Sequence, residues 1–374
     1  PVPGLLYETI ALRDPDNNGV EFIHGVGLPA NGYGIIQSNW FGSPLTGLND
    51  VIDFTGGKRP NAILQILDNV FNGSSDDILD LDGTDALIEG NRFLHAHKGN
   101  PNVGDTASAI SGGADSGLTS RLTIVRNLFY DCDHMALCKE GNFYTIVNNT
   151  VVHMTIGGVN FSEPERGTPP GAGVLMDGNI FWDVPQLFLN YTAAVMQVTV
   201  NRSILPTNWP GTGNLVADPR LSNLNSNTIT WQTLPNDFRL LAGSPATATG
   251  PNGLDMGGLV PGGASISGEP PSLTASPNAT LNVGGPGITH YRWKLNNGDY
   301  GVELSVATII QLPGLMNGTY VVSVLGKNDA GVWQDASRPT VSKTWTVNSG
   351  LSRLVLNEVM ALNNSAVRIN GGYP

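Results

Sequence analysis

Charged residues, cysteines and long apolar runs are all scarce in this chain of 374 residues. Only 13% of the residues are charged, with 19 Lys and Arg against 31 Asp and Glu, which gives a formal net charge of -12. The chain therefore lacks the basic stripe that neutralises phosphates, and nucleic acid is excluded as an expected partner. No apolar run reaches the roughly 18 residues of a spanning helix, so no membrane span is predicted.

Cysteine pairs and helix-forming runs are also nearly missing. The two cysteines, Cys132 and Cys138, lie six positions apart. A local disulfide is open to them if the segment is a tight turn, and free thiols are expected if Cys138 lies within a strand. The 47 glycines and 25 prolines, without long Glu/Lys/Ala/Leu segments, favour many turns and an all-β fold. The opening residues "PVPGLLYETI" contain no signal sequence, as expected of a processed or trimmed chain.

What the chain does contain is an internal repeat. A phrase of alternating apolar residues followed by Asn-x-apolar recurs with its asparagines 22 to 36 residues apart. These asparagines are Asn39, Asn69, Asn91, Asn127, Asn149 and Asn179. Two short strands per period, joined by variable turns, predict the stacked coils of a solenoid. We expect the asparagine amides to bond to one another where the strands bend.

A second repeated phrase predicts an inward-facing apolar ladder. It gives equivalent positions on five coils to Phe54, Leu81, Ile110, Leu137 and Phe161. Inward side chains of this kind would be buried against the coils above and below. The predicted architecture is a right-handed parallel β-helix over residues 1–257, with about seven to nine coils.

The segments "NLVADPRLSN", "DFRLLAGSPATATG" and "LDMGG" carry a family resemblance. They resemble the C-terminal part of secreted bacterial right-handed β-helix proteins, the broad pectin-lyase-like superfold. The matching residues are Asp218, Pro219, Phe238, Arg239, Leu240, Ser244, Pro245 and Asp255. The resemblance covers roughly residues 20–260 and implies the fold, an extracellular or cell-surface location and a bacterial source. It does not imply one activity, because the superfold carries lyases, hydrolases and adhesins alike.

Two further modules are expected after a Gly/Pro/Ser linker at residues 258–272. Residues 273–348 resemble a fibronectin type III or immunoglobulin-like module, with Leu315, Gly318 and Tyr320 at its tyrosine corner and Trp293 as its core tryptophan. Residues 349–374 resemble the first strand of a lamin-tail-like domain, which implies that the given chain ends within a third domain.

The acidic stretch at residues 74–93 raises the question of a metal site. Aligning the coils places Asp53 and Asp80 at equivalent outward positions, about 4.8 Å apart, where two carboxylates repel. Oxygen ligands from Asp53, Asp77, Asp80 and Asp82 would suit Ca²⁺. The alternative is a solvated acidic face whose carboxylates bond to backbone N–H groups.

Two basic residues near this stretch could do chemistry. Polysaccharide lyases on β-helices commonly combine Ca²⁺ or Arg with a Lys or Arg base, and "MALCKEGN" faintly resembles the Lys-bearing coil of chondroitinase-B-like and alginate lyases. This resemblance implies Lys139 as base, with Arg166 in the neighbouring loop. The Arg-His-Gly coil of that family is absent, which puts the activity in doubt. A paired-carboxylate hydrolase is a further alternative, and His95 with His97 could be a metal pair or simply loop histidines.

The sequence favours a non-enzymatic function. A secreted or cell-surface structural or adhesive protein is expected, able to form a fibre or layer and to bind a polysaccharide or other copies of itself, with Ca²⁺ as an optional ligand. Modular β spacers, few charges and the lack of a complete catalytic motif support this interpretation. The alternative is a lyase or hydrolase acting on an acidic glycan.

Overall fold

The computed structural model describes residues 21–28, 34–43, 50–98 and 106–351. Within these residues the chain is nearly all β, with parallel strands in its N-terminal part and mainly antiparallel strands in its C-terminal part. The all-β prediction is confirmed. Residues 1–20 of the first predicted domain, and the predicted third domain from residue 352 onward, lie outside the described residues.

Two parallel sheets build the N-terminal part. The larger has 11 strands: β1 (Ile23–Val26), β3 (Trp40–Phe41), β4 (Ile52–Thr55), β6 (Val70–Ser74), β7 (Leu79–Asp80), β9 (Arg92–Ala96), β10 (Ser108–Gly112), β12 (Leu128–Cys138), β14 (Thr150–Asn160), β16 (Ile180–Trp182) and β17 (Phe188–Leu189). The smaller has 7 strands: β2 (Gly34–Gln37), β5 (Leu64–Leu67), β8 (Ala86–Glu89), β11 (Arg121–Val125), β13 (Phe143–Val147), β15 (Gly173–Asp177) and β18 (Gln197–Asn201).

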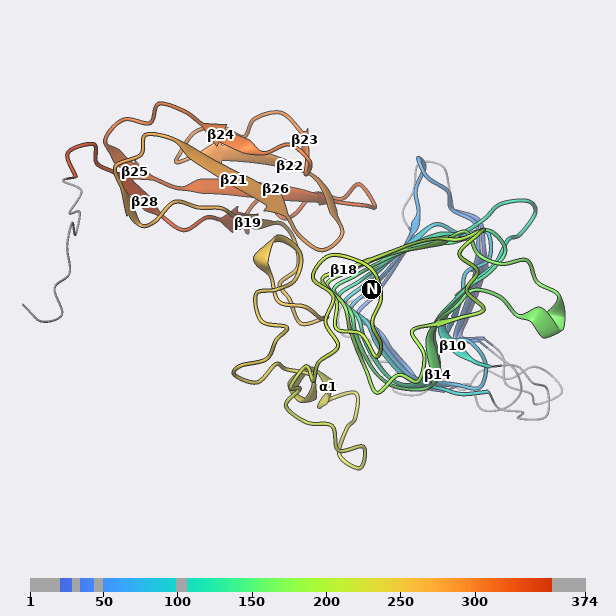
Figure 1. Cartoon of the computed structure of the whole chain (residues 1–374). Helices are drawn as coiled ribbons and strands as arrows, with labels where there is room; N and C mark the ends of the chain where they lie inside the picture. The colour runs from blue at the N-terminus through green and yellow to red at the C-terminus, as the bar shows by residue number, and fades with distance from the viewer. Residues whose placement is uncertain (1–20, 29–33, 44–49, 99–105, 352–374) are drawn as a thin grey trace, which may run out of the picture.

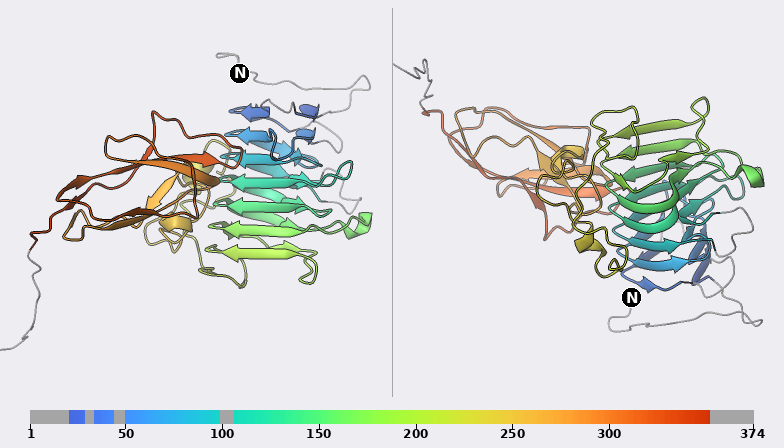
Figure 2. Two further views of the ribbon diagram at one scale, coloured as in Figure 1. Left: turned by 90° about the horizontal axis from the view of Figure 1, so that it is seen from above. Right: turned by 60° about the horizontal axis from the view of Figure 1, so that its bottom comes forward.

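The strands of these sheets alternate along the chain, so each winding of the polypeptide lies beside the next. Long strands β12 and β14 run through a bend in the larger sheet, and β12 pairs with β9 before the bend and with β10 after it. Figure 1 looks along this stack and Figure 2 shows its strands as parallel rungs. We call this part the coil stack. Residues far apart in sequence thereby become neighbours on adjacent coils.

An asparagine ladder joins the coils at one corner, as predicted. The backbone N–H of each ladder asparagine donates to the side-chain oxygen of the next, at 2.8 to 2.9 Å from Asn39 through to Asn179. From Asn39 to Asn149 each side-chain amide also donates to that same oxygen. From Asn69 onward each also donates to a carbonyl of the coil before, as Asn91 does to Ile66 at 2.8 Å. Buried amides are thus fully bonded, and the ladder fixes the phase of successive coils.

A phenylalanine ladder stands two residues after the asparagines. The rings of Phe41, Phe71, Phe93 and Phe129 stack with centroids 5.0, 5.0 and 4.8 Å apart and planes within 8° of parallel. Such pairs contribute about 0.5–1.5 kcal/mol each beyond their buried area. The recurring Asn-x-Phe phrase therefore encodes two stacked ladders, one polar and one aromatic.

The predicted inward ladder is wrong in part. Phe54, Leu81 and Phe161 are buried in the main core, but Ile110 pairs with Leu79, two residues before Leu81. Leu137 pairs with Ser111, which pairs with Asp80, and so it lies outside the main core cluster. Every residue of β10 is buried. The in-and-out alternation that fixes a register is consequently missing from that strand.

The two cysteines do not form a disulfide. Cys132 and Cys138 both lie in β12, where they are buried free thiols. Their six-residue separation along one strand keeps them apart, as expected for Cys138 within a strand.

The segment after β18 turns back along the outside of the coil stack. Short helices α1 (Leu234–Asp237) and η2 (Pro251–Gly253) interrupt it, and η1 (Pro164–Arg166) lies earlier, in the loop after β14. Its apolar residues Leu221, Ile229, Leu234 and Phe238 pack on the outer side of β9, β12 and β14. This segment, which carries the resemblance motifs "NLVADPRLSN" and "DFRLLAGSPATATG", covers one outer face of the stack (Figure 1).

Three small sheets form the C-terminal module. They are β19 (Ser265–Ser267) with β21 (Ala279–Gly284) and β24 (Ile310–Leu312); β20 (Leu273–Thr274) with β28 (Trp345–Val347) and β25 (Gly318–Tyr320); and β23 (Leu304–Ser305) with β22 (Ile288–Leu295), β26 (Val322–Asn328) and β27 (Thr340–Val341). Strand β19 falls within the predicted linker 258–272.

The tryptophan at the core of this module is not the predicted one. Trp345 is the fully buried tryptophan, and Trp293 is only partly buried at the edge of the same core. The hydroxyl of Tyr320 donates to the carbonyl of Met316 at 2.9 Å, the contact that a tyrosine corner makes.

The C-terminal module is held against the smaller sheet of the coil stack. The carboxylate of Asp329 accepts hydrogen bonds from Thr123 Oγ1 at 2.5 Å and from the guanidinium of Arg59. Ala330 packs beside Val125 and Leu87. The module therefore covers the outer side of β8 and β11, and the larger sheet lies on the other side of the stack (Figure 2).

Candidate functional site

The acidic stretch forms a cluster of carboxylates on successive coils. Asp53 in β4 pairs in register with Asp80 in β7, as predicted. Asp50 and Asp77 each stand two residues before the same two strands. Carboxylate oxygens of Asp50, Asp76 and Asp77 all lie within 4.8 Å of one another. We call the following group the acidic cluster: Asp50, Asp53, Asp76, Asp77, Asp80 and Asp82.

Local turns on either side of β7 position these side chains. Before the strand, Asp77 Oδ1 accepts a hydrogen bond of 2.6 Å from the backbone N–H of Ser108 on the next coil. After it, Gly83 turns the chain with a left-handed φ of 60°. A strand of two residues between two such turns leaves Asp80 and Asp82 beside the turns. Parallel pairing then stacks carboxylate on carboxylate.

Burial and mutual repulsion hold protons on this cluster. Burial, and then the charges of Asp77 and Asp80, raise the pKa of Asp50 to about 10. Burial and then Asp76 raise the pKa of Asp77 to about 7. Burial and then Asp82 raise the pKa of Asp80 well above its ordinary value. A nearby cation would relieve this repulsion and favour the charged carboxylates.

The cluster also contains buried oxygens without partners. Among the described residues, Asp80 Oδ1 and Asp82 Oδ1 are shielded from solvent and accept no hydrogen bond. A side chain at Gly113 would bring its Cβ within 2.6 Å of Asp82 Oδ1 and of Glu140 Oε2, so the glycine leaves room beside these oxygens. Oxygen-only ligands at such spacing fit a hard divalent cation, because Ca²⁺ takes six to eight oxygens.

Lys139, Glu163 and Arg166 approach the cluster from later coils. Lys139 Nζ lies 3.4 Å from Glu163 Oε2, and Arg166 Nε lies 3.8 Å from Glu163 Oε1. Burial lowers the pKa of Lys139, but Glu163 and then Asp80 outweigh burial and raise it to about 12. Lys139 is thus held as a cation beside the acids.

Most of the predicted site residues are therefore brought together. All four predicted ligands, Asp53, Asp77, Asp80 and Asp82, belong to the acidic cluster, although only Asp77 is a member of its tightest triad. The other triad members, Asp50 and Asp76, and the acid Glu163 were missed as site residues. Asp50 could have been found because it precedes β4 by two residues, just as Asp77 precedes β7 by two residues. Glu163 could have been found by its place in the loop of Arg166.

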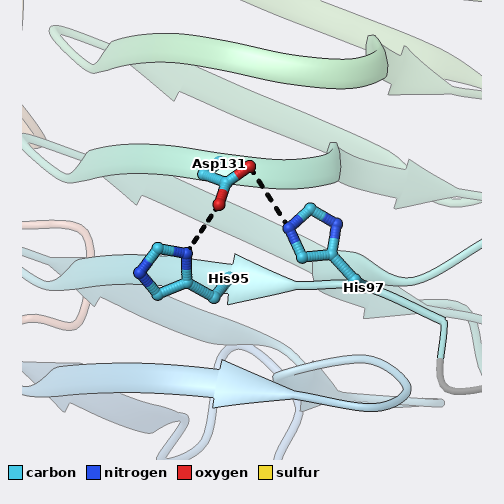
Figure 3. Close-up of side chains that lie close together, drawn as sticks. All are labelled: His95, His97 and Asp131. Atoms are coloured by element: carbon cyan, nitrogen blue, oxygen red, sulfur yellow. Dashed lines mark hydrogen bonds and ion pairs between the residues drawn. The ribbon is translucent and has the colours of Figure 1, made fainter. Parts of the chain in front are cut away.

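The histidine pair lies at a different corner of the coil stack. His95 is in β9 and His97 follows that strand, and both side chains point toward Asp131 of β12 (Figure 3). His95 Nδ1 lies 2.7 Å from Asp131 Oδ2, and His97 Nε2 lies 3.3 Å from Asp131 Oδ1. Hydrogen bonds that the His97 ring donates to Asp131 and then to Asp133 raise the pKa of His97 to about 9. Of the two predicted loop histidines, His97 lies outside a strand and His95 lies within β9, and both contact carboxylates.

A cleft of about 800 Å³ opens beside this second corner. Its wall includes Tyr130, His153, Trp182 and Asp183 from the coil stack and Asp218 from the returning segment. The cleft thus combines aromatic surfaces with ionisable groups. The acidic cluster is not part of its lining.

Comparison with known proteins adds no relative to this description. No protein-family model matches the chain, and no curated protein matches it significantly. The described residues contain no helix with the length and apolar character needed to cross a membrane. The two ionisable clusters are therefore the features of the described residues from which we infer a function.

Proposed function

We propose that this chain is an extracellular, modular structural or adhesive protein that binds an acidic polysaccharide through a divalent cation held at the acidic cluster. In this proposal, residues 1–257 form a right-handed parallel β-helix of the pectin-lyase-like superfold. Residues 273–348 form a fibronectin type III or immunoglobulin-like module. The parallel register of the coils and the asparagine ladder support the first assignment, and the Tyr320 contact supports the second.

The observation that carries the cation is the pair of buried, unpartnered oxygens of Asp80 and Asp82. An unmatched buried carboxylate oxygen costs free energy, and here it lies among other acids rather than beside a donor. Ca²⁺ would supply the missing partner and offset the repulsion. Its flexible coordination suits ligands from more than one coil.

The acidic glycan follows from the same geometry. A Ca²⁺ ion bound by two or three protein carboxylates keeps coordination positions for other oxygens, and a uronic acid carboxylate is such a ligand. Lys139 and Arg166 stand at the edge of the cluster as cations that a second sugar carboxylate could pair with. The site would therefore select anionic sugars over neutral ones.

Binding without cleavage is favoured by the state of Lys139. A lysine whose pKa is raised to about 12 carries its proton at neutral pH and cannot accept one from a sugar. Together with the low charge and the modular β architecture, this favours an adhesive role in bacterial extracellular layers or fibres, with copies of itself as further partners. Cell-surface or secreted location is part of the proposal.

A polysaccharide lyase is the second candidate, and one observation favours it. Lys139 and Arg166 lie 27 residues apart in the sequence, yet both reach Glu163 next to the acidic cluster. A bound cation would weaken the hold of the acids on the Lys139 proton and so make this lysine a better base. Lyase chemistry at this position would then be cation-dependent.

Calorimetry with Ca²⁺ tests the cation. We expect one site of extracellular affinity, on the order of 10⁻⁴–10⁻³ M, and loss of its heat in Asp80→Asn. Asp299→Asn, at an exposed position of the C-terminal module, is the matched control and should bind as wild type does. Equal heats in wild type and Asp80→Asn would remove this site.

A glycan panel decides between binding and cleavage. The binding proposal expects Ca²⁺-dependent retention on uronate polymers and no release of unsaturated sugars. Release of such products by wild type, abolished in Lys139→Met, would replace the adhesive assignment with the lyase. Retention that is unchanged by a chelator would contradict both.

A further inference from the structure

A column of alternating imidazoles and carboxylates runs up one corner of the coil stack. Counting four residues on from successive ladder asparagines gives His95, Asp131, His153 and Asp183. Each directly follows a residue that pairs in register with the next coil: Leu94, Tyr130, Val152 and Trp182. The four share a left-handed backbone, with φ of 59°, 54°, 60° and 54°. One structural position on four coils is thus filled by His, Asp, His and Asp in turn.

Three imidazole nitrogens converge on the central carboxylate of this column. His95 Nδ1 lies 2.7 Å from Asp131 Oδ2. His97 Nε2 lies 3.3 Å from Asp131 Oδ1, and His153 Nε2 lies 3.9 Å from the same oxygen. The ligand atoms of His95, His97 and Asp131 all lie within 4.8 Å of one another (Figure 3).

Two of these imidazoles also contact a second carboxylate through their other ring nitrogen. His97 Nδ1 lies 2.9 Å from Asp133 Oδ1, and His153 Nδ1 lies 2.6 Å from Asp183 Oδ2. Asp133 is itself held by the backbone N–H of Lys98 at 3.1 Å and by Thr155 Oγ1 at 2.6 Å. Both Nδ1 atoms are engaged, so both Nε2 atoms are left to face Asp131.

We propose that His95, His97 and Asp131 bind a borderline transition-metal ion such as Zn²⁺, with His153 placed to complete its coordination. Imidazole nitrogen with carboxylate oxygen is a donor set that Zn²⁺ accepts in tetrahedral geometry at about 2.0–2.2 Å. A carboxylate behind the second nitrogen of a ligating histidine is the usual means of setting its tautomer and ring orientation. The acidic cluster, with oxygen donors only, has the different preference of a hard cation.

The corner is open to loading from solvent. The side chains of His95, His97 and Asp131 are 41%, 37% and 27% exposed. His153 and Asp183 also line the adjacent cleft of about 800 Å³. A metal ion here would keep any remaining coordination position directed at solvent or the cleft. The same contacts could instead be made by protonated imidazoles alone, and the experiment is chosen to separate these two states.

Calorimetry with Zn²⁺, in excess Ca²⁺ to occupy the acidic cluster, is the first test. We expect one saturable site in wild type, no measurable site in His97→Gln, and roughly 10–100-fold weaker binding in Asp133→Asn, which removes only the orienting carboxylate. His290→Gln is the matched control, because His290 lies in the C-terminal module, where its ring bonds to Thr289, and should leave the affinity unchanged. Circular dichroism checks that each variant is folded.

X-ray absorption of the Zn²⁺-loaded wild-type protein gives an independent readout. Scattering from two or three imidazoles with no sulfur ligand is expected. Oxygen-only coordination, the absence of saturable Zn²⁺ binding, or undiminished binding in His97→Gln would each overturn the proposal and leave a network of protonated histidines. Because Ca²⁺ is present throughout, failure here leaves the acidic-glycan proposal standing, and failure of Ca²⁺ binding leaves this one standing.

Discussion

The acidic cluster and the histidine corner are built on neighbouring sets of coils by the same stacking, yet their electrostatics are opposite. In the acidic cluster, Asp53 stacks on Asp80, like on like, and burial with repulsion raises carboxylate pKa values. In the histidine corner, Asp131 stands between His95 and His153, and hydrogen bonds from the imidazoles lower its pKa.

The difference shows which column of stacked side chains can neutralise its own charges and which cannot. A column that alternates base and acid completes its own hydrogen bonds, whereas a column of acids leaves oxygens of Asp80 and Asp82 without partners. The first column therefore has its charges paired within the protein, and under our proposal a cation would pair those of the second. Three predictions test this contrast.

The largest effect on stability is expected from Asp133→Ala, which removes a carboxylate from the histidine corner. Asp133 accepts hydrogen bonds from the backbone of Lys98 and Ala107 and from Thr155, in addition to its contact with His97. Its removal should cost about 2–4 kcal/mol in the free energy of unfolding, measured with urea, because several donors lose a charged acceptor.

Asp183→Ala is the control for that change. The side chain of Asp183 is 63% exposed and its contact is with His153, so its loss should cost no more than about 1 kcal/mol. Equal losses in the two variants would contradict the distinction between an anchored and an exposed carboxylate.

A pH titration of the metal-free protein should show an intermediate effect. The folded pKa of Asp77, about 7, is above its ordinary value of 3.8, so its contribution to stability is fully present below about pH 4 and is lost as the pH rises through about 7. The melting temperature with chelator should therefore fall between about pH 5 and about pH 8, and added Ca²⁺ should restore it most at the upper end.

The variant Asp77→Asn separates the two clusters in this titration. It should flatten the fall around neutral pH. It should retain the loss at higher pH, where His97, whose pKa is raised to about 9, and Asp50, whose pKa is raised to about 10, give up their protons. An unchanged slope in Asp77→Asn would show that Asp77 is not its source.

The smallest effect is expected from Asp80→Asn, and its sign is informative. In chelator at neutral pH the amide removes a repelled carboxyl and should raise the free energy of unfolding by up to about 1 kcal/mol. In saturating Ca²⁺ the same change should lower the melting temperature below that of wild type, because a ligand is lost. Destabilisation by the same amount with and without Ca²⁺ would mean that no ion binds there.

The parts predictable from sequence were those that repeat with a visible phrase. Asn-x-apolar recurs on six coils, so the asparagine ladder and the all-β fold could be inferred. Asp53 and Asp80 were paired correctly because the two phrases "VIDFTGG" and "ILDLDGT" match residue for residue. Ile110 was placed two residues out of register because "SAISGG" was aligned by its glycines. In a strand buried on both sides, polarity gives no alternative guide.

The pairing of His95 and His97 with carboxylates was missed for a different reason. His95 and Asp131 are 36 residues apart, and coil length varies from 22 to 36 residues, so no fixed period joins them. The ladder asparagines Asn91 and Asn127 are also 36 residues apart. If each residue's position had been counted from the nearest preceding ladder asparagine, the sequence would have predicted this column. Contacts with the C-terminal module, such as Arg59 with Asp329, join the repeat to residues outside it. No repeated position in the sequence therefore indicates them.

The returning segment has a consequence for how the protein unfolds. Repeat arrays tend to lose their end units first, because each unit touches only its neighbours. Here Leu234 and Phe238 lie in one apolar cluster with Leu94, Tyr130 and Val152, which belong to three successive coils. Those coils cannot fray singly while this segment is in place, so the middle of the array should melt as one cooperative block that includes the histidine corner.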